Sequence, residues 1–320
     1  MPVQRSVTVF GGSGFVGRYV VARLASEGWI IRVAVRRPRE ANFLKPLGDV
    51  AQIVPIACNI TSKEQVQRAL QGSGAAINLV GILQSRGRQT FEGVHVQGAR
   101  NIAEAAAAEG ITRFVHISAL GADETSRSHY ARTKALAEKA IREVLPTAAI
   151  LRPSVVFGPE DSFFNRFASM ARFSPFLPLI GGGTTRFQPL YVGDLADVVL
   201  ECLGKKDRAV QTYELGGPGI YSFKELMELI LATIGRRRKL ISIPWGLASF
   251  MGSFLEKLPN APLTRDQVEQ LKTDNVVSGQ LPGLQDFEVE PHSVEVIIPT
   301  YLDRYRRHGR AAGRLSPGAG

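Results

Sequence analysis

The sequence has few cysteines and no long apolar run. Cys58 and Cys202 are the only cysteines among its 320 residues, and they form no Cys-x-x-Cys pair. This usage favours buried thiols in a reducing compartment over a disulfide or a metal site. No stretch approaches the roughly 20 apolar residues that a membrane span needs. Residues 1–6 lead almost directly into a predicted strand, so we expect no targeting peptide and a cytoplasmic location.

Two kinds of catalytic site are also absent. The histidines show no metal-ligand spacing, which argues against a metal centre; they are His95, His116, His129, His292 and His308. No Gly-x-Ser-x-Gly motif follows a predicted strand, which argues against a Ser-His-Asp hydrolase. We therefore expect neither metal catalysis nor a nucleophilic serine.

Acidic residues are outnumbered by basic ones. The chain carries 29 Asp and Glu against 39 Lys and Arg, a formal net charge of +10. Such an excess suits phosphate-rich ligands, nucleic acid, an anionic lipid surface or an acidic protein, and charge alone does not choose among them. Part of it lies at 236–239 and in the tail beyond 303, where ordinary solvated surface is an equal explanation.

What the sequence does contain, at its start, is the pattern of a strand, a glycine turn and a helix. An apolar run at 7–10 is followed by three regularly spaced glycines and then by apolar residues at helical intervals. In a βαβ unit such glycines allow a tight turn, contact of the backbone with a pyrophosphate and close helix packing. A turn that binds nothing is the alternative. We predict a dinucleotide site formed by Gly11, Ser13, Gly14, Phe15, Val16 and Gly17.

The second predicted strand, 29–35, ends at Arg36 and Arg37. In dinucleotide folds an acid at this place binds the 2′-hydroxyl of NAD, whereas arginine accommodates the 2′-phosphate of NADP. A guanidinium pairs well with phosphate. These residues therefore favour NADP(H), although two exposed arginines at a strand end would give the same pattern.

Strands and helices alternate through the first half of the chain. Helices are expected at 61–70, opened by a capping box at Thr61 and Glu64, and at 91–109. Strands are expected at 53–57, 75–81 and 113–118, so that strands and helices alternate. This predicts an α/β fold, a Rossmann-like doubly wound parallel sheet with helices on both faces and a smaller C-terminal α/β lobe. The expected division is 1–160 with 186–216, 161–185 with 217–302, and a disordered basic tail at 303–320.

Tyr130 and Lys134 lie four residues apart in a strongly helical stretch, so they share one face of a helix. The ordinary pKa of tyrosine, about 10, makes it a poor base, but a neighbouring ammonium favours the phenolate and can also reach a ribose hydroxyl. An ordinary helix with an exposed Tyr and Lys is the alternative. Beside a nucleotide fold, we predict an active site.

In this order the motifs resemble the extended and atypical short-chain dehydrogenases/reductases. The likeness rests on the glycine turn, Asn59, Ser118, Tyr130-x-x-x-Lys134 and the run at 151–158. It implies that the tyrosine is the acid/base, that the lysine lowers its pKa and orients the nicotinamide ribose, and that Ser118 helps to hold substrate. The chain departs from the family pattern at Leu120, where a hydroxyl is usual. Cofactor contacts are also expected from Asn59, Ile60, Val80, Gly81, Ser118, Pro153 and Val155.

Residues 244–258 carry large apolar side chains at intervals of three and four. These define one broad helix face, made of Leu247, Phe250, Met251, Phe254, Leu255 and Leu258. Packing in the core is the first interpretation. Docking on a partner or at a membrane interface is the second.

The segment 263–278, with 11–18 and Arg36-Arg37-Pro38, is similar to the nucleotide-binding accessory subunits of respiratory complex I, in their mitochondrial and α-proteobacterial forms. The resemblance implies a tightly held NADPH without established turnover. It also implies partners in the peripheral arm near the quinone-entry region, contact with the membrane surface and a position on the cytoplasmic face of a bacterial inner membrane. A free-standing NADP-dependent reductase, epimerase or dehydratase is the alternative. Nucleic-acid binding is not expected, because no recognised motif supports it.

Overall fold

The structure is a computed structural model that describes residues 5–204, 211–258 and 261–306. Of the tail expected to be disordered at 303–320, Asp303–Tyr305 forms a 3-10 turn, and the part beyond 306 lies outside the described residues. The first four residues, on which the expectation of no leader depended, also lie outside them. The chain forms two compact units. The first comprises Met1–Pro153, Val192–Leu215 and Val277–Glu290, and the second comprises Ser154–Tyr191, Gly216–Val276 and Pro291–Gly320.

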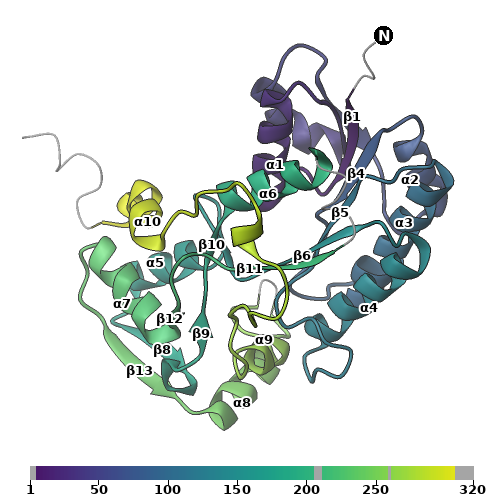
Figure 1. Cartoon of the computed structure of the whole chain (residues 1–320). Helices are drawn as coiled ribbons and strands as arrows, with labels where there is room; N and C mark the ends of the chain where they lie inside the picture. Colours follow the sequence, from purple (N-terminus) through teal and green to yellow (C-terminus); the bar gives the residue numbers. More distant parts are fainter. Residues whose placement is uncertain (1–4, 205–210, 259–260, 307–320) are drawn as a thin grey trace, which may run out of the picture. The chain divides into compact units, whose positions relative to one another are not determined.

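The first unit is built on a seven-stranded sheet in which neighbouring strands pair in parallel (Figure 1). Its strand order is β11-β6-β5-β4-β1-β2-β3, which runs outward from β1 in both directions. The predicted doubly wound parallel sheet is therefore confirmed. The strands are β1 (Ser6–Phe10), β2 (Ile30–Val35), β3 (Ile53–Ala57), β4 (Ala75–Asn78), β5 (Phe114–Ile117), β6 (Ala149–Pro153) and β11 (Thr212–Leu215).

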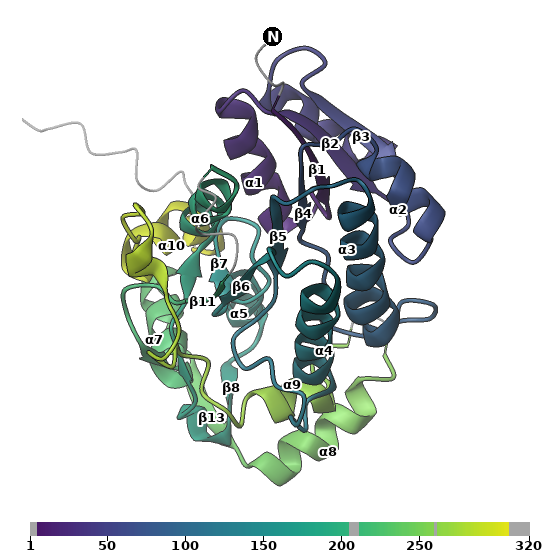
Figure 2. The same cartoon turned by 45° about the vertical axis from the view of Figure 1, so that its right-hand side comes forward.

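Helices cover both faces of this sheet. One face carries α1 (Phe15–Ser26) and α6 (Val192–Gly204), which an Arg23–Asp197 ion pair joins (Figure 1). The other carries α2 (Lys63–Leu70), α3 (Gly98–Ala108) and α4 (His129–Val144), as Figure 2 shows. The described residues of this unit also include a 3-10 helix at Pro38–Leu47, a π-helical turn at Glu92–Gln97 and a 3-10 turn at Leu284–Asp286.

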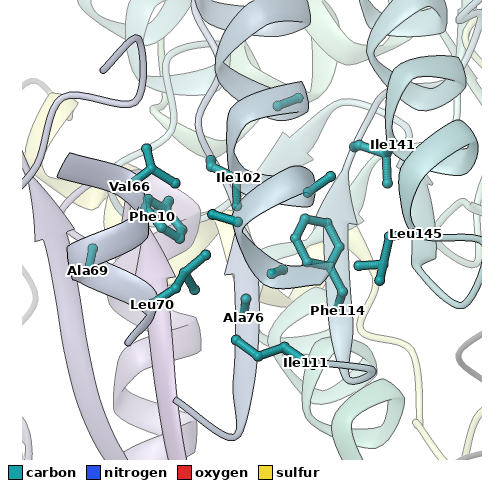
Figure 3. Close-up of a cluster of buried hydrophobic side chains, with 14 of the residues drawn as sticks. Phe10, Val66, Ala69, Leu70, Ala76, Ile102, Ile111, Phe114, Ile141 and Leu145 are labelled. Carbon is teal, nitrogen blue, oxygen red and sulfur yellow. The ribbon is translucent and has the colours of Figure 1, made fainter. Parts of the chain in front are cut away.

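The apolar core of the first unit lies between the sheet and α2, α3 and α4 (Figure 3). Phe10 on β1 and Phe114 on β5 meet Leu70 of α2 and Ile102 of α3, and all four are buried. Because these contacts join side chains of the strands to side chains of the helices, they fix the helices to the sheet. The carboxyl ends of the strands are thereby held at one edge, where doubly wound sheets bind ligands.

The second unit consists of three two-stranded sheets and five α-helices within its described residues. Its main core gathers Phe157, Phe164, Phe223 and Ile298. The strands are β7 (Val156–Phe157), β8 (Phe176–Ile180), β9 (Arg186–Phe187), β10 (Leu190–Tyr191), β12 (Tyr221–Ser222) and β13 (Lys239–Ile243). The helices are α5 (Phe164–Phe173), α7 (Phe223–Thr233), α8 (Trp245–Leu255), α9 (Arg265–Gln270) and α10 (Val294–Leu302), with 3-10 turns at Gly181–Gly183 and Asp303–Tyr305.

Two local expectations need correction. The N-cap of α2 is Ser62, whose hydroxyl accepts the Gln65 N–H, whereas the Thr61 hydroxyl donates to Asn59 Oδ1 at 3.0 Å, in the turn before the helix. Residues 277–290, expected in the smaller lobe, belong to the first unit, since the Glu214 N–H donates to the Pro282 carbonyl at 2.9 Å. Conversely, 154–160 and 186–191, expected in the larger domain, belong to the second unit.

The first interpretation of the apolar face at 244–258 is wrong. Leu247, Phe250, Phe254 and Leu258 are exposed, whereas the buried residues of α8 are the small Ala248 and Gly252. None of the described helices is long and apolar enough to span a bilayer. Both cysteines are buried, and burial raises the pKa of the Cys58 thiol to about 11.

Candidate functional site

The glycine turn joins β1 to α1 with the close approach that its spacing predicts. Gly11 has φ +80°, a conformation that favours glycine. A Cβ atom at Gly17 would lie 2.4 Å from the carbonyl oxygen of Gly11, so the helix packs against the turn only because that atom is missing. Gly14 is the N-cap of α1, and it has no side chain with which to cap that helix end. The first turn of α1 thus offers backbone N–H groups of the kind that bind phosphate.

The rest of the predicted phosphate cradle surrounds this helix end. Ser13, Phe15 and Val16 are half-buried at the start of α1. Val80 lies two residues beyond the end of β4, and its N–H donates to Asn78 Oδ1 at 3.1 Å. A Cβ at Gly11 would lie 3.2 Å from the backbone nitrogen of Val80, so the two strand ends are in contact.

Arg36 and Arg37 are both exposed at the end of β2. Arg37 Nη1 lies 2.9 Å from Glu40 Oε1, and the Arg36 guanidinium lies beside the side-chain amide of Gln89. Nearby, the Arg18 guanidinium stacks 5.1 Å from the centre of the Phe43 ring. The end of β2 therefore presents a cluster of guanidinium groups, of which Arg37 already has a carboxylate partner.

Asn59 and Ile60 follow the neighbouring strand β3. The Asn59 side-chain oxygen accepts the Thr61 N–H at 3.2 Å, so it shapes its own turn. The Ile60 carbonyl accepts from Asn101 Nδ2 at 2.8 Å. A Cβ at Gly98 would lie 2.5 Å from Ile60 Cδ1, which shows that α3 makes room for this side chain.

Tyr130 and Lys134 lie on α4, whose N-cap is Ser128. Lys134 is buried, and its Nζ donates to the Ile117 carbonyl at 2.7 Å. Burial lowers the pKa of Lys134 to about 8, and the nearby Glu138 carboxylate opposes that shift. A Cβ at Gly81 would lie 3.9 Å from Lys134 Nζ. The ammonium therefore reaches the loop after β4, where the predicted cofactor contacts Val80 and Gly81 lie.

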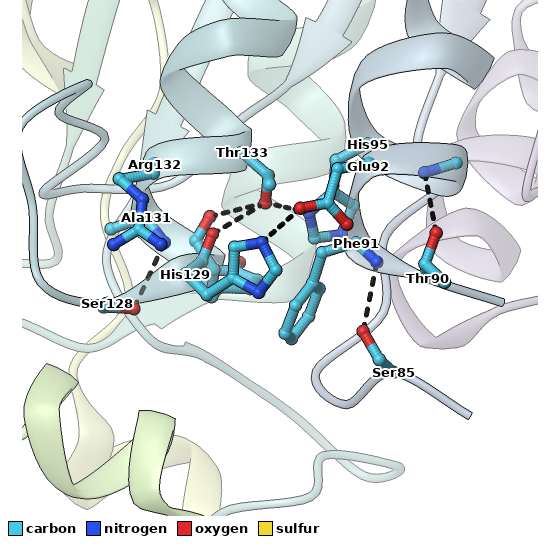
Figure 4. A network of polar contacts seen from close by, with 12 residues as sticks. Ser85, Thr90, Phe91, Glu92, His95, Ser128, His129, Ala131, Arg132 and Thr133 are labelled. Atoms are coloured by element: carbon cyan, nitrogen blue, oxygen red, sulfur yellow. Dashed lines mark hydrogen bonds and ion pairs between the residues drawn. The ribbon is translucent and has the colours of Figure 1, made fainter. Parts of the chain in front are cut away.

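His95, which sequence reasoning did not select, connects the loop after β4 to α4. Figure 4 shows it beside Thr133 of α4. Its Nε2 accepts the Ile82 N–H at 3.0 Å, so the proton is on Nδ1, which donates to Thr133 Oγ1 at 3.0 Å. Thr133 in turn donates to a backbone carbonyl of α4. Burial, with the Lys134 charge, lowers the pKa of His95 to about 3, so the ring is neutral.

Aromatic contacts complete this network. The rings of His95 and Tyr130 meet edge to face at 5.5 Å between centroids, and Phe91 meets Tyr130 at 6.1 Å. His129 pairs with Glu92 of the π-helical turn. π-Helical turns often occur at functional sites. This one holds His95 against the face of α4 that carries Tyr130.

Ser118 makes a different contact from the one that the family resemblance implies. Its hydroxyl donates to the buried Glu138 carboxylate, which accepts two further bonds from Arg152 at 2.9 and 2.6 Å. Leu120, at the position where the family has a hydroxyl, is buried. His116, on the neighbouring strand β5, is buried, and both its ring nitrogens lack a hydrogen-bond partner within the described residues.

The last two predicted cofactor residues fall in different units. Pro153 ends β6 in the first unit, where its carbonyl accepts the Leu120 N–H at 3.0 Å. Val155 belongs to the second unit and donates its N–H to Asn275 Oδ1 at 2.9 Å. Among the described residues there is no group of three or more His, Cys, Asp or Glu side chains that could hold a metal ion.

Residues 7–216 match the model of the NAD dependent epimerase/dehydratase family. The chain is 34% identical over 315 residues to an Arabidopsis thaliana protein, NADH dehydrogenase (ubiquinone) 1 alpha subcomplex subunit 9, mitochondrial, with 94% of this chain and 78% of the relative covered. It is 32% identical over 239 residues to a ceramide reductase of Caulobacter vibrioides, with 74% and 73% covered.

Among solved structures, the dTDP-glucose 4,6-dehydratase DesIV from Streptomyces venezuelae, with NAD and TYD bound, has a TM-score of 0.72. It is 19% identical, with 95% of this chain and 98% of that chain covered, and so shares the fold. The chain therefore belongs to the NAD dependent epimerase/dehydratase family and, within it, to the same family of proteins as the Arabidopsis relative.

Proposed function

We propose that this protein is an accessory subunit of respiratory complex I that holds a tightly bound NADPH in a structural or regulatory role. The observation that carries the proposal is the similarity to a complex I subunit over 94% of the chain. We place the subunit with other subunits of the peripheral arm, near the quinone and membrane end, on the cytoplasmic face of a bacterial inner membrane. No nucleic-acid partner is proposed.

The residues around the glycine turn support a dinucleotide there. The diphosphate would lie on the uncapped N-terminus of α1, and Arg36 and Arg37 would hold the 2′-phosphate that distinguishes NADP from NAD. Lys134 would donate to the nicotinamide ribose beside Tyr130. When bound, NADPH supplies a hydride that can be transferred. Because the cofactor binds the folded state alone, it would also stabilise the subunit by mass action.

The surroundings of Ser118 favour a holding role over turnover. Its hydroxyl is committed to Glu138, and Leu120 offers no hydroxyl in its place. A substrate carbonyl beside Tyr130 would then lack the second hydrogen-bond donor that the family uses. Tyr130 and Lys134 can still bind the cofactor without completing a catalytic set.

Mild detergent extraction of the native protein tests the proposal. Sizing should place the protein in a very large assembly, and nucleotide analysis should find NADPH in it. Replacing Arg36 and Arg37 by Glu should lower cofactor content and assembly together. A small species that consumes NADPH would contradict the proposal, as would full assembly of the cofactor-free variant.

A free-standing NADP-dependent reductase is the second candidate. The Tyr130–Lys134 pair favours it, as does the similarity to the Caulobacter ceramide reductase. Tyr130→Phe separates the two proposals, because an enzyme should lose roughly 10² or more in turnover with its acid/base. An accessory subunit carrying the same change should assemble normally and keep its NADPH.

A further inference from the structure

Arg166 is a half-buried cation without a protein partner. It lies on α5, and its side chain makes no hydrogen bond, ion pair or ring contact within the described residues. Burial lowers the pKa of its guanidinium, and no nearby carboxylate opposes that shift. A charge that is withdrawn from water without a partner costs free energy of folding. The residue is therefore a candidate for a role other than stability.

Two other half-buried arginines show how this fold usually treats a guanidinium. Arg152 is paired with the Glu138 carboxylate through two hydrogen bonds. Arg142 donates to two backbone carbonyls and to Thr212 Oγ1. The fold supplies acceptors to both of these groups, so Arg166 departs from the pattern.

The acids around α5 are engaged elsewhere. This helix packs against α7, α10, β8 and the 3-10 turn at Asp303–Tyr305 (Figure 1). Neither α5 nor β8 contains an acid. The acids of the other three elements, and the one just before α5, each have another partner: Asp161 with Tyr301, Glu225 with Ser222, Glu228 with Lys224, Glu295 with Tyr221 and Asp303 with Arg306. None of them balances the charge of Arg166.

Apolar side chains border Arg166 on the same side of α5. Phe163 lies three residues before it and Met170 four residues after it, so all three share one side of the helix. Phe163 and Met170 are half-buried and pack against the main core of the second unit. The Phe163 ring is fixed there, since it meets the rings of Phe187 and Phe223 at 5.8 and 6.1 Å between centroids. The helix thus presents apolar surface beside the cation.

This combination of groups matches one kind of ligand. A guanidinium pairs with a phosphate or a carboxylate through two parallel hydrogen bonds and remains charged at physiological pH. The ring of Phe163 offers a flat contact surface, and the flexible thioether of Met170 adapts to the shape of what it touches. A molecule that carries both an oxyanion and an apolar body would satisfy the cation and cover the apolar side chains.

We propose that Arg166, Phe163 and Met170 bind an organic oxyanion, a molecule with a phosphate or carboxylate group on an aromatic or other apolar body. The oxyanion pairs with the Arg166 guanidinium, and the body lies on Phe163 and Met170. These residues belong to the second unit, whereas the glycine turn belongs to the first. The inference therefore does not depend on the NADPH of the proposed function.

The stability of a variant tests whether the fold keeps this cation for a ligand. Arg166→Met removes the unpartnered charge and keeps an unbranched side chain, so it should raise the melting temperature by about 2 °C or more in a buffer without phosphate or carboxylate. Arg172→Met is the matched control, because Arg172 is on the same helix but exposed, 5.4 Å from the centre of the Phe173 ring. It should leave the melting temperature unchanged or slightly lower. A clear fall for Arg166→Met, or failure to fold, means that Arg166 stabilises the fold and overturns the proposal.

Thermal shifts of the NADPH-loaded protein test binding directly. Phenyl phosphate and benzoate are the probes, and inorganic phosphate is the oxyanion without an apolar body. At least one probe should raise the melting temperature of the wild type by about 2 °C or more, and the larger rise identifies the preferred oxyanion. Arg166→Met should lose this response and Arg172→Met should keep it. Arg166→Lys should keep a weaker response, because an ammonium lacks the paired geometry of a guanidinium.

The remaining outcomes decide against the proposal. No rise with either probe overturns it, as does an equal rise in wild type and Arg166→Met, which would mean that the anion binds elsewhere. A rise of the same size with inorganic phosphate would mean that the apolar body makes no contact. Bound NADPH is measured in every sample. Its absence from all of them contradicts the proposed function alone, because the comparison of wild type with Arg166→Met still locates the anion.

Discussion

The Ser118 hydroxyl donates to the carboxylate of Glu138, one helical turn beyond Lys134 on α4. That carboxylate also holds Arg152 of β6 through two hydrogen bonds. The serine is thereby tied to a largely buried ion pair beneath the helix that carries Tyr130. Ser118 thus helps to fix α4 to the sheet, and its hydroxyl proton is already in use.

Breaking this ion pair should destabilise the protein strongly. Glu138→Gln leaves the Arg152 guanidinium without its carboxylate, at a cost of about 3 kcal/mol in the free energy of unfolding. Urea unfolding measures the change. Glu143→Gln is the matched control, because its partner Arg100 is a surface residue of the neighbouring helix and exposed pairs contribute at most about 1 kcal/mol. Equal effects of the two changes would contradict a structural role for the Glu138 pair.

The glycine turn should reject even one added methyl group. At Gly17 a Cβ would meet backbone atoms of Gly11 and Gly12 within 2.6 Å, so Gly17→Ala must move α1. We expect a loss of about 2 kcal/mol in unfolding free energy and weaker NADPH binding. Gly246→Ala, also in the first turn of a helix but facing open space, is the control and should be neutral or slightly stabilising. A Gly17→Ala protein as stable as the control would contradict the close packing.

Local patterns were enough to predict the sheet and its first turn. The glycine spacing and the alternation of strands with helices are short-range signals, and each predicts the same βαβ geometry. The Tyr130–Lys134 spacing was also readable, since residues four apart share a helix face. The Glu138–Arg152 ion pair was not, because that contact joins a helix to a strand through the packing of the sheet.

Two features lay beyond local patterns for physical reasons. The apolar residues at 244–258 predict a helix with one apolar face, but they do not say whether that face is buried. Only the fit of Ala248 and Gly252 against their neighbours decides which side faces inward. His95 depends on a π-helical turn, which has no sequence signature of its own, and on an Ile82 N–H thirteen residues away. Tertiary contacts determine both.

The guanidinium cluster at the end of β2 should select NADPH over NADH. Arg36→Ser/Arg37→Ser should weaken NADPH binding at least about tenfold and leave NADH binding unchanged, because only NADPH carries the 2′-phosphate. Fluorescence titration measures both affinities. Arg39→Ser, an exposed neighbour, is the control. A parallel loss of affinity for both nucleotides would mean that the arginines do not contact the 2′-phosphate.

The Arg37–Glu40 pair offers a second test of the same contact. Glu40 Oε1 lies 2.9 Å from Arg37 Nη1, so it would compete with a bound 2′-phosphate for the Arg37 guanidinium. Glu40→Gln should therefore strengthen NADPH binding severalfold, with the largest gain at low salt. No change in affinity would indicate that Arg37 does not reach the nucleotide and that Arg36 acts alone.

His95 should make the stability of the protein fall in acid. Burial and the Lys134 charge lower the pKa of His95 from its ordinary 6.5 to about 3 in the folded state. Between these values the unfolded chain binds a proton that the folded chain does not. Stability is therefore lost as the pH falls from about 6.5 toward 3, by about 1 kcal/mol per pH unit from this residue.

Substitution of His95 by a residue that does not titrate should remove this dependence. In His95→Gln, the amide can still accept the Ile82 N–H and donate to Thr133, so the variant should fold. Urea unfolding at several pH values from 4 to 7 should give a shallower slope than that of the wild type by about 1 kcal/mol per pH unit. His292→Gln, an exposed histidine of the second unit, should keep the wild-type slope. If His95→Gln loses stability in acid as steeply as the wild type, His95 is not held neutral by the fold, and the proton assignment that links it to Thr133 is wrong.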